Sequence, residues 1–129
     1  VEVVNPKVID KAFRVAKQGH AEAILLLPGP FFSERKRIAN LAIEGQFPTI
    51  MDRPQFANAG GLMSYGADIQ ALYRQAATYV DQILRGAKPA ELPVKRPTKF
   101  KFVINLKTAE KLGITVPPAL LIQASELIE

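Results

Sequence analysis

Residues that could do chemistry gather in three short segments of this sequence, each at the carboxyl end of a predicted strand. The segments read PGPFFS over 28–33, MDRP over 51–54 and SYGAD over 64–68. In an open parallel sheet the carboxyl ends of the strands meet at one edge, and ligands bind beyond that edge. Aromatic rings, charges and hydrogen-bond donors there are the chemistry of a small-molecule pocket. The ligand-binding residues predicted on this basis are Pro30, Phe31, Phe32, Ser33, Asp52, Arg53, Ser64, Tyr65 and Asp68.

These residues also have structural interpretations, which the sequence leaves open. Phe31 or Phe32 could be the hydrophobic staple of a helix whose cap is Ser33. Asp52 could form a surface ion pair with Arg53, the next residue. Asp68 precedes a long helical pattern and is a natural N-cap for that helix.

Catalytic, metal and cofactor chemistry find little support. His20 is the single histidine, stands at a predicted turn and has no neighbouring carboxylate cluster, so a surface position is expected. Cysteine is absent, which excludes disulfides and thiolate metal sites. The stretch AGGLMSYG lacks the strand–loop–helix order of a phosphate-binding loop. Ser33 and Ser64 have no base at a recognisable spacing. We therefore predict no enzyme, no metal and no cofactor.

Charge and hydropathy limit the partners. The formal net charge is +5, and the excess lies between Arg85 and Lys101 in a proline-rich stretch. That stretch lacks the interleaved exposed aromatic residues of a single-strand binder, so nucleic acid is not expected as a partner. No apolar run approaches the ~20 residues needed to cross a bilayer. With 48% hydrophobic residues, the 129-residue chain can form a core of its own.

Hydrophobic periodicity predicts alternating strands and helices. The apolar run Ile24–Leu27 is typical of a strand buried on both faces. The stretch KFKFVINL over 99–106 alternates like a half-buried strand. The order is typical of an α/β fold with a largely parallel sheet. The predicted strands lie at 1–4, 24–27, 47–52, 62–66 and 99–106, and the predicted helices at 5–18, 33–43, 68–85 and 108–112, with 54–60 a loop or one helical turn and the last residues an apolar segment or a final helix.

The words AILLLPGPFFSERKRIANLA, GGLMSYG, YVDQILRGAKPAELPV and FVINLKTAEKLGITVPP together resemble one known family. This is the ABC-transporter substrate-binding family that includes tryptophan-binding-like lipoproteins, and the resemblance covers essentially the whole chain. It implies the type I periplasmic binding architecture, with two Rossmann-like lobes of mostly parallel sheet flanked by helices. This chain would be the C-terminal portion of a protein about twice as long or more. Residues 1–63 would form the core of the ligand-binding lobe, 64–97 the inter-lobe crossing with the long helix and connector, and 98–129 the return strand and C-terminal segment.

The resemblance also implies a function. The protein would capture a small solute, aromatic or amino-acid-like, in the cleft between the lobes and deliver it to an ABC permease of the inner membrane. Its location would be periplasmic or otherwise extracytoplasmic, and a lipid anchor could lie in an N-terminal region absent from this chain. Relatives often carry a Thr-Asp-Asn sequence where this chain has 28–33, and the departure favours a flatter, more apolar or aromatic ligand. The alternative is a cytoplasmic effector-sensing or receiver-like α/β interaction domain.

Two further expectations concern the chain as a piece of a longer protein. It opens inside the predicted strand VEVV, which suggests a cut within a domain. By the resemblance, the long helix belongs against the missing lobe, so its apolar face would be uncovered. Such a stripe favours pairing with another chain, and we predict a homo-oligomer for the isolated piece. The apolar face in question comprises Leu72, Ala76, Val80 and Ile83.

Overall fold

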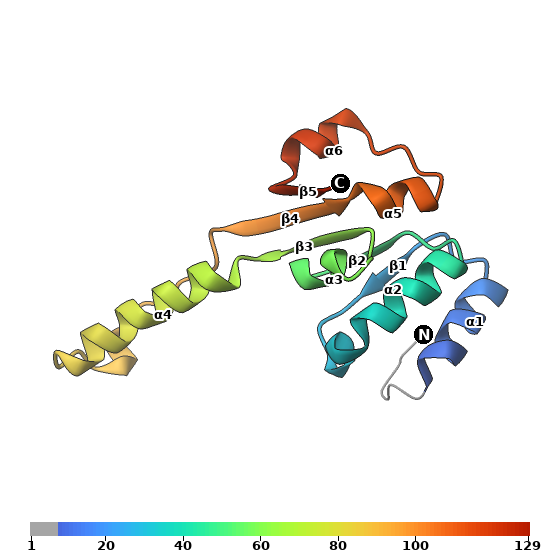
Figure 1. Cartoon of the computed structure of the whole chain (residues 1–129). Coiled ribbons are helices and arrows are strands. Elements are labelled where there is room, and N and C mark those ends of the chain that lie inside the picture. Colours follow the sequence, from blue (N-terminus) through green and yellow to red (C-terminus); the bar gives the residue numbers. More distant parts are fainter. Residues whose placement is uncertain (1–7) are drawn as a thin grey trace. The chain divides into compact units, whose positions relative to one another are not determined.

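A computed structural model describes residues 8–129 of the chain (Figure 1). The strand expected over VEVV and the helix start expected at Asn5 and Pro6 lie outside these residues. Two compact units are present. Among the described residues, the first comprises 8–66 together with Lys101–Glu129, and the second comprises Ala67–Phe100.

The first unit alternates strands and helices, as the sequence predicts. Helix α1 ends before Gly19 and α2 ends before Gly45, so both predicted helix ends are confirmed. Strand β3 begins in this unit, and β4 returns to it from the second unit. The elements are α1 (Ile9–Gln18), β1 (Ile24–Leu26), the 3-10 helix η2 (Pro30–Glu34), α2 (Arg35–Glu44), β2 (Thr49–Met51), α3 (Pro54–Asn58), β3 (Met63–Ala67), β4 (Phe100–Asn105), α5 (Leu106–Lys111), α6 (Pro118–Gln123) and β5 (Glu126–Ile128).

The strands form one mostly parallel sheet in the order β1-β2-β3-β4-β5, which confirms the predicted fold class. Strands β1, β2 and β3 run parallel to one another, and β4 runs parallel to β5. Between β3 and β4 the direction is antiparallel. The Asn105 N–H donates to the Leu62 carbonyl, while farther along the pair the ring of Tyr65 meets the ring of Phe102.

Two hydrophobic clusters stabilise this unit. One gathers α1, α2, α3 and β2 around Phe56, which is fully buried. The other joins the C-terminal elements around Ile104, also fully buried. Asn105 connects them, because its Nδ2 donates to the Ala57 carbonyl at the end of α3, and its Oδ1 caps α5 by accepting from the Thr108 N–H.

Two strand predictions need correction. Leu25 and Leu27 are 67% and 70% exposed, so β1 is not buried on both faces. Successive side chains of a strand point to opposite faces, and the described helices cover only the face of β1 that carries its neighbour Leu26. Conversely, β4 is not simply half-buried. Val103 and Ile104 are both fully buried, because both faces are covered at that end of the strand.

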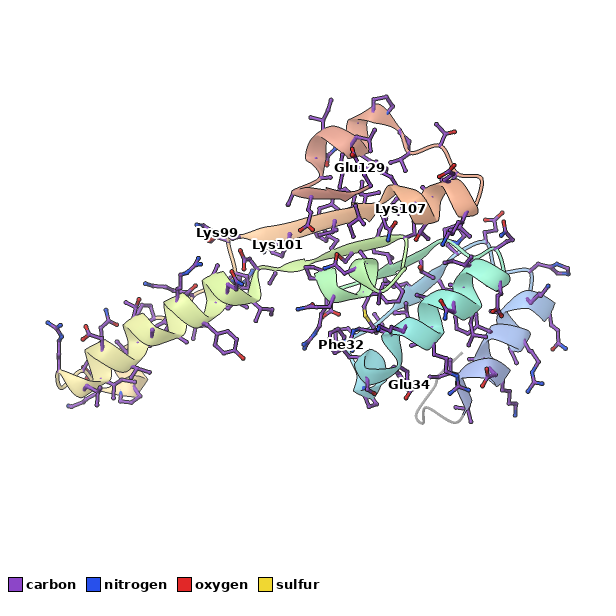
Figure 2. All side chains as sticks on the ribbon, viewed as in Figure 1. Phe32, Glu34, Lys99, Lys101, Lys107 and Glu129 are labelled. Atoms are coloured by element: carbon purple, nitrogen blue, oxygen red, sulfur yellow. The ribbon has the colours of Figure 1, made fainter. Side chains whose placement is uncertain are left out.

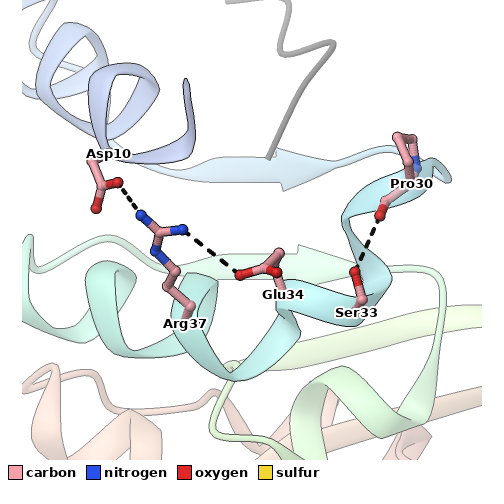
Figure 3. A network of polar contacts seen from close by, with 5 residues as sticks. All are labelled: Asp10, Pro30, Ser33, Glu34 and Arg37. Atoms are coloured by element: carbon pink, nitrogen blue, oxygen red, sulfur yellow. Dashed lines mark hydrogen bonds and ion pairs between the residues drawn. The ribbon is translucent and has the colours of Figure 1, made fainter. Parts of the chain in front are cut away.

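The predicted helix cap at Ser33 is also wrong. The chain enters α2 through η2, and Glu34 stands at the N-cap position without a side-chain cap bond. Ser33 is exposed, and its Oγ donates to the Pro30 carbonyl at 3.4 Å. Figure 3 shows that Arg37, in the first turn of α2, forms ion pairs with both Asp10 of α1 and Glu34.

The second unit consists of a long helix and a segment that runs back along it. Helix α4 (Ile69–Leu84) is followed by the 3-10 helix η3 (Pro89–Glu91) and an extended connector. The Tyr79 hydroxyl donates to the Pro93 carbonyl, and Lys95 Nζ lies 5.7 Å from the centre of the Tyr79 ring. One side of α4 is thus covered by its own connector. No helix in residues 8–129 is long and apolar enough to cross a membrane.

Candidate functional site

The carboxyl ends of β1, β2 and β3 meet at one edge of the sheet. Leu26 pairs with Met51, and Met51 pairs with Ser64, so β1 and β2 end at the same level and β3 continues beyond it to Ala67. The residues after Leu26 and Met51 enter the first two predicted segments. This arrangement is the topological position at which open parallel sheets bind ligands.

Direct contacts join the three segments. The Cζ atom of Arg53 lies 5.0 Å from the centre of the Phe32 ring, which connects the segment after β1 with the segment after β2. Gly66 connects the second segment with the third. A Cβ atom built on Gly66 would lie 1.9 Å from the carbonyl oxygen of Asp52, far inside contact distance. Only glycine therefore lets the β3 backbone come so close, a role that a glycine within a strand pattern can signal.

Phe32 carries two guanidinium groups on its ring. Besides Arg53, the Cζ atom of Arg35 lies 4.9 Å from the ring centre, within the range of a cation–π interaction. The Nη1 of Arg35 also donates to the Phe32 carbonyl at 3.2 Å. Figure 2 labels Phe32, which lies where η2 leads into α2. Sequence reasoning missed Arg35, although its spacing of three residues from Phe32 on a helical turn is the available signal.

Phe31 and Phe32 both have packing roles. Each is half-buried against the cluster around Phe56. Phe31 also borders a hollow of about 830 Å³ between α1 and β1, which is lined mainly by apolar side chains. Contact of either ring with a ligand stays a prediction.

Asp52 and Arg53 form a loose surface pair. Their closest atoms, Arg53 Nε and Asp52 Oδ2, are 3.9 Å apart, which is too long for a hydrogen bond. The side chains are 48% exposed for Arg53 and 35% exposed for Asp52. Such a pair contributes little to stability, so both charged groups stay accessible to a ligand.

The remaining predicted site residues differ in accessibility. Tyr65 is 54% exposed, and its ring meets the Phe102 ring edge-on with 6.0 Å between centres. Pro30 is exposed at the start of η2. Ser64 is fully buried, and its Oγ has no hydrogen-bond partner in the described part of the chain. A ligand at the surface can reach Tyr65 and Pro30 more readily than Ser64.

Asp68 belongs to the second unit, where it caps α4. Its Oδ1 accepts from the backbone N–H groups of Gln70 at 2.9 Å and Ala71 at 3.2 Å. The N-cap interpretation is therefore confirmed. In the same unit the Asp68 N–H donates to the Lys99 carbonyl, which fixes the connector at the start of the helix.

Within residues 8–129 no group of three or more histidine, cysteine, aspartate or glutamate side chains could hold a metal ion. His20 is exposed at the turn between α1 and β1 and has a φ of 53°. This position agrees with the surface role expected for it. The polar groups that printed contacts join at the sheet edge are the Asp52 carboxylate and the guanidinium groups of Arg35 and Arg53, a set suited to binding and orienting a small molecule.

The sequence matches one protein family over nearly its whole length. The family described as "ABC transporter substrate binding protein" matches residues 1–128. Among curated proteins, none matches the chain.

Solved structures with a similar fold include proteins from three bacteria. A conserved domain protein from Vibrio cholerae is 26% identical with a TM-score of 0.87, and 98% of this chain covers 43% of that protein. An ABC domain from Streptococcus pneumoniae in complex with L-Trp is 28% identical with a TM-score of 0.84, and 98% of this chain covers 44% of it. A substrate-binding protein with adhesive properties from Clostridium difficile, in a ligand-free open state, is 16% identical with a TM-score of 0.72. The match covers 98% of this chain and 42% of that protein, and at this identity it shows a likeness of fold alone. The chain thus spans less than half the length of these proteins.

Proposed function

Because this chain belongs to the family of ABC transporter substrate-binding proteins, we propose that it is the solute-capturing part of an ABC importer. The family match over residues 1–128 is the observation that carries this proposal. It favours the importer over a cytoplasmic effector-sensing domain. The role is binding and release, and no residue of the chain is assigned a catalytic step.

The solute would bind beyond the carboxyl ends of β1, β2 and β3. The segment at Phe31 and Phe32 would supply apolar and aromatic contact, while Asp52 and Arg53 would meet polar groups of the solute. Tyr65 is sufficiently exposed to take part. The chain covers 43% and 44% of two similar solved proteins, so the rest of a longer protein would form the other wall of the cleft.

A small aromatic or amino-acid-like solute fits this edge best. Two phenylalanines and a tyrosine stand in or beside the segments that converge there. One similar structure, 28% identical, was solved in complex with L-Trp. Delivery to a permease of the inner membrane, and therefore a periplasmic or otherwise extracytoplasmic location, follows from the importer role. A lipid anchor outside this chain would serve the same role.

The isolated 129-residue chain should associate with itself. The side of α4 away from its connector exposes large apolar side chains, and bare apolar surface drives association. Leu72, which the sequence placed on the bare face, instead borders the connector side. The exposed members are Ile69, Tyr73, Val80, Ile83 and Leu84. Sedimentation over a dilution series tests this point, and a monomer at every micromolar concentration would refute it.

The function itself is tested by screening the full-length gene product for solutes. Thermal shift with a panel of amino acids, aromatic acids, amines and sugars should reveal at least one stabilising solute. A solute present at 100 times its Kd should stabilise the folded protein by about 2.7 kcal/mol. Calorimetry then measures the affinity. A protein that no small solute stabilises, and that does not associate with an ABC permease of its own organism, would contradict the proposal.

A further inference from the structure

We propose that Arg35 and Arg53 form an anion-binding pair that recognises a carboxylate group of the transported solute. This inference rests on the proposed solute-binding function and adds the chemical class of the solute. It concerns residues of the first unit only, and Arg35 was not among the residues that the sequence alone singled out.

The two guanidinium groups come from different elements to the same ring. Arg35 is the first residue of α2, and Arg53 follows β2. Their Cζ atoms lie 4.9 Å and 5.0 Å from the centre of the Phe32 ring. The ring offsets part of the repulsion between the two cations and holds each planar group against an aromatic surface. This arrangement fixes two positive charges at the ligand-binding edge.

Most of the hydrogen-bonding capacity of this pair is unused. A guanidinium group has five N–H donors in a fixed fork. Arg35 donates to the Phe32 carbonyl, and this is the one hydrogen bond of its side chain in the described part of the chain. Arg53 makes no side-chain hydrogen bond there, since Asp52 lies 3.9 Å away. The fork of an arginine matches the two oxygens of a carboxylate, which makes a carboxylate the natural partner.

A neighbouring arginine, Arg37, provides a comparison, because its guanidinium group is paired with carboxylates of the chain itself. Arg37 donates to Asp10 and lies 3.7 Å from Glu34, so carboxylates of the chain itself neutralise it (Figure 3). Residues 8–129 supply no carboxylate within 4.0 Å of Arg35. A carboxylate of the solute would fill that role at the sheet edge.

This charge arrangement discriminates between solutes. A solute amine would meet two cations, with Asp52 alone to attract it. A neutral amide could accept hydrogen bonds but would lack the charge that strengthens them. We therefore expect acids to bind better than amines or amides of the same shape, because hydrogen bonds between ionised partners are about twice as strong as neutral ones.

Three indoles of matched size provide the probes, namely indole-3-propionate, indole-3-propionamide and tryptamine. Calorimetry on the full-length gene product should give an affinity for the acid about tenfold or more above that for either counterpart. Arg35→Gln and Arg53→Gln should each weaken binding of the acid about tenfold and weaken binding of the amide much less, because only the acid loses a charge-assisted hydrogen bond. Lys36→Gln is the matched control, because Lys36 is an exposed cation of the same helix with no contact to the ring. Equal affinities for acid and amide, or unchanged affinity for the acid in both arginine variants, would overturn the proposal.

Acetate provides a probe that does not depend on whether an indole fits. In nuclear magnetic resonance spectra, the side-chain Nε–H signals of Arg35 and Arg53 should shift with added acetate, and the signal of Arg37 should stay in place. Circular dichroism checks that each variant is folded. If neither signal moves, the anion-binding pair is refuted even where the solute screen succeeds. If both signals move but no solute stabilises the protein, the pair stands and the importer function fails.

Discussion

Replacing Gly66 by alanine tests whether the close approach of β3 to the segment after β2 builds the candidate site. The added Cβ would lie 1.9 Å from the Asp52 carbonyl oxygen and 2.9 Å from its carbonyl carbon. Carbon and oxygen atoms that are not bonded approach to about 3.3 Å at closest. One backbone segment must therefore move by more than ~1 Å, since no flexible side chain stands in the way.

The expected loss in the free energy of unfolding can be taken from insertions that overpack a well-packed region. Such insertions destabilise proteins by about 1–3 kcal/mol, and a clash between two backbones belongs at the upper end. Each kcal/mol lowers Tm by about 2–8 °C for domains between 60 and 250 residues. Thermal unfolding followed by circular dichroism measures the shift. Since Asp52 itself must move, affinity for any solute that contacts it should fall as well.

Gly29 provides the matched control. It stands in the segment after β1, its backbone is extended with a φ of −179°, and an added Cβ would meet the Phe31 ring at an ordinary 3.6 Å. Gly29→Ala should leave Tm nearly unchanged. If Gly66→Ala and Gly29→Ala unfold at the same temperature as the wild type, the close approach of the two segments is not a constraint, and our account of the edge is wrong.

Three further predictions concern the ring pair, the carboxylate and the link between the two cores. Replacing Phe31 and Phe32 together by alanine should weaken solute binding several-fold, because aromatic contacts contribute about 0.5–1.5 kcal/mol beyond the area that they bury; unchanged affinity in calorimetry would remove both rings from the site. Asp52→Asn should weaken binding of a solute that carries a hydroxyl or ammonium group by about 1.5–3 kcal/mol, whereas wild-type affinity would indicate the surface pair alone. Asn105→Ala should lower the free energy of unfolding by about 1–3 kcal/mol in urea titration, since it leaves the Ala57 carbonyl and the Thr108 N–H without the partners they have now. An unfolding midpoint equal to that of the wild type would show that this link is dispensable.

The sequence by itself determined the order of the elements as far as α5 and most helix ends, but it did not predict the last strand, β5. These features depend on local physics. Helices α1 and α2 end before Gly19 and Gly45, where the helical period of apolar residues also ends. Asp68 caps α4 by accepting from two backbone N–H groups within three residues of it. Alternation of strands with helices implied a mostly parallel sheet, because parallel neighbours need a crossover between them. That inference used no contact between distant residues.

Predictions from local sequence failed where a side chain had another hydrogen-bond partner or where burial depended on distant elements. Ser33 is a residue type that often caps helices, but the chain forms η2 before α2, and the Ser33 hydroxyl donates to the Pro30 carbonyl instead. The apolar run of β1 could not reveal that one of its faces carries exposed leucines, since burial depends on which elements cover a strand rather than on the strand. Likewise, the burial of Val103 on β4 depends on packing from both sides.

Only the tertiary structure decided how the site is composed. Phe32 and Arg53 are 21 positions apart in the sequence, and only the register of β1, β2 and β3 brings their segments together. Arg35 looked like one cation among several at the start of a helix, and its place on the Phe32 ring follows from the turn of η2 into α2. Gly66 is an ordinary glycine in the sequence, and it matters because the Asp52 carbonyl occupies the space where a side chain would be. Spacing along a chain specifies contacts within a helix or strand, whereas contacts between strands depend on register, which the whole buried face of the sheet sets.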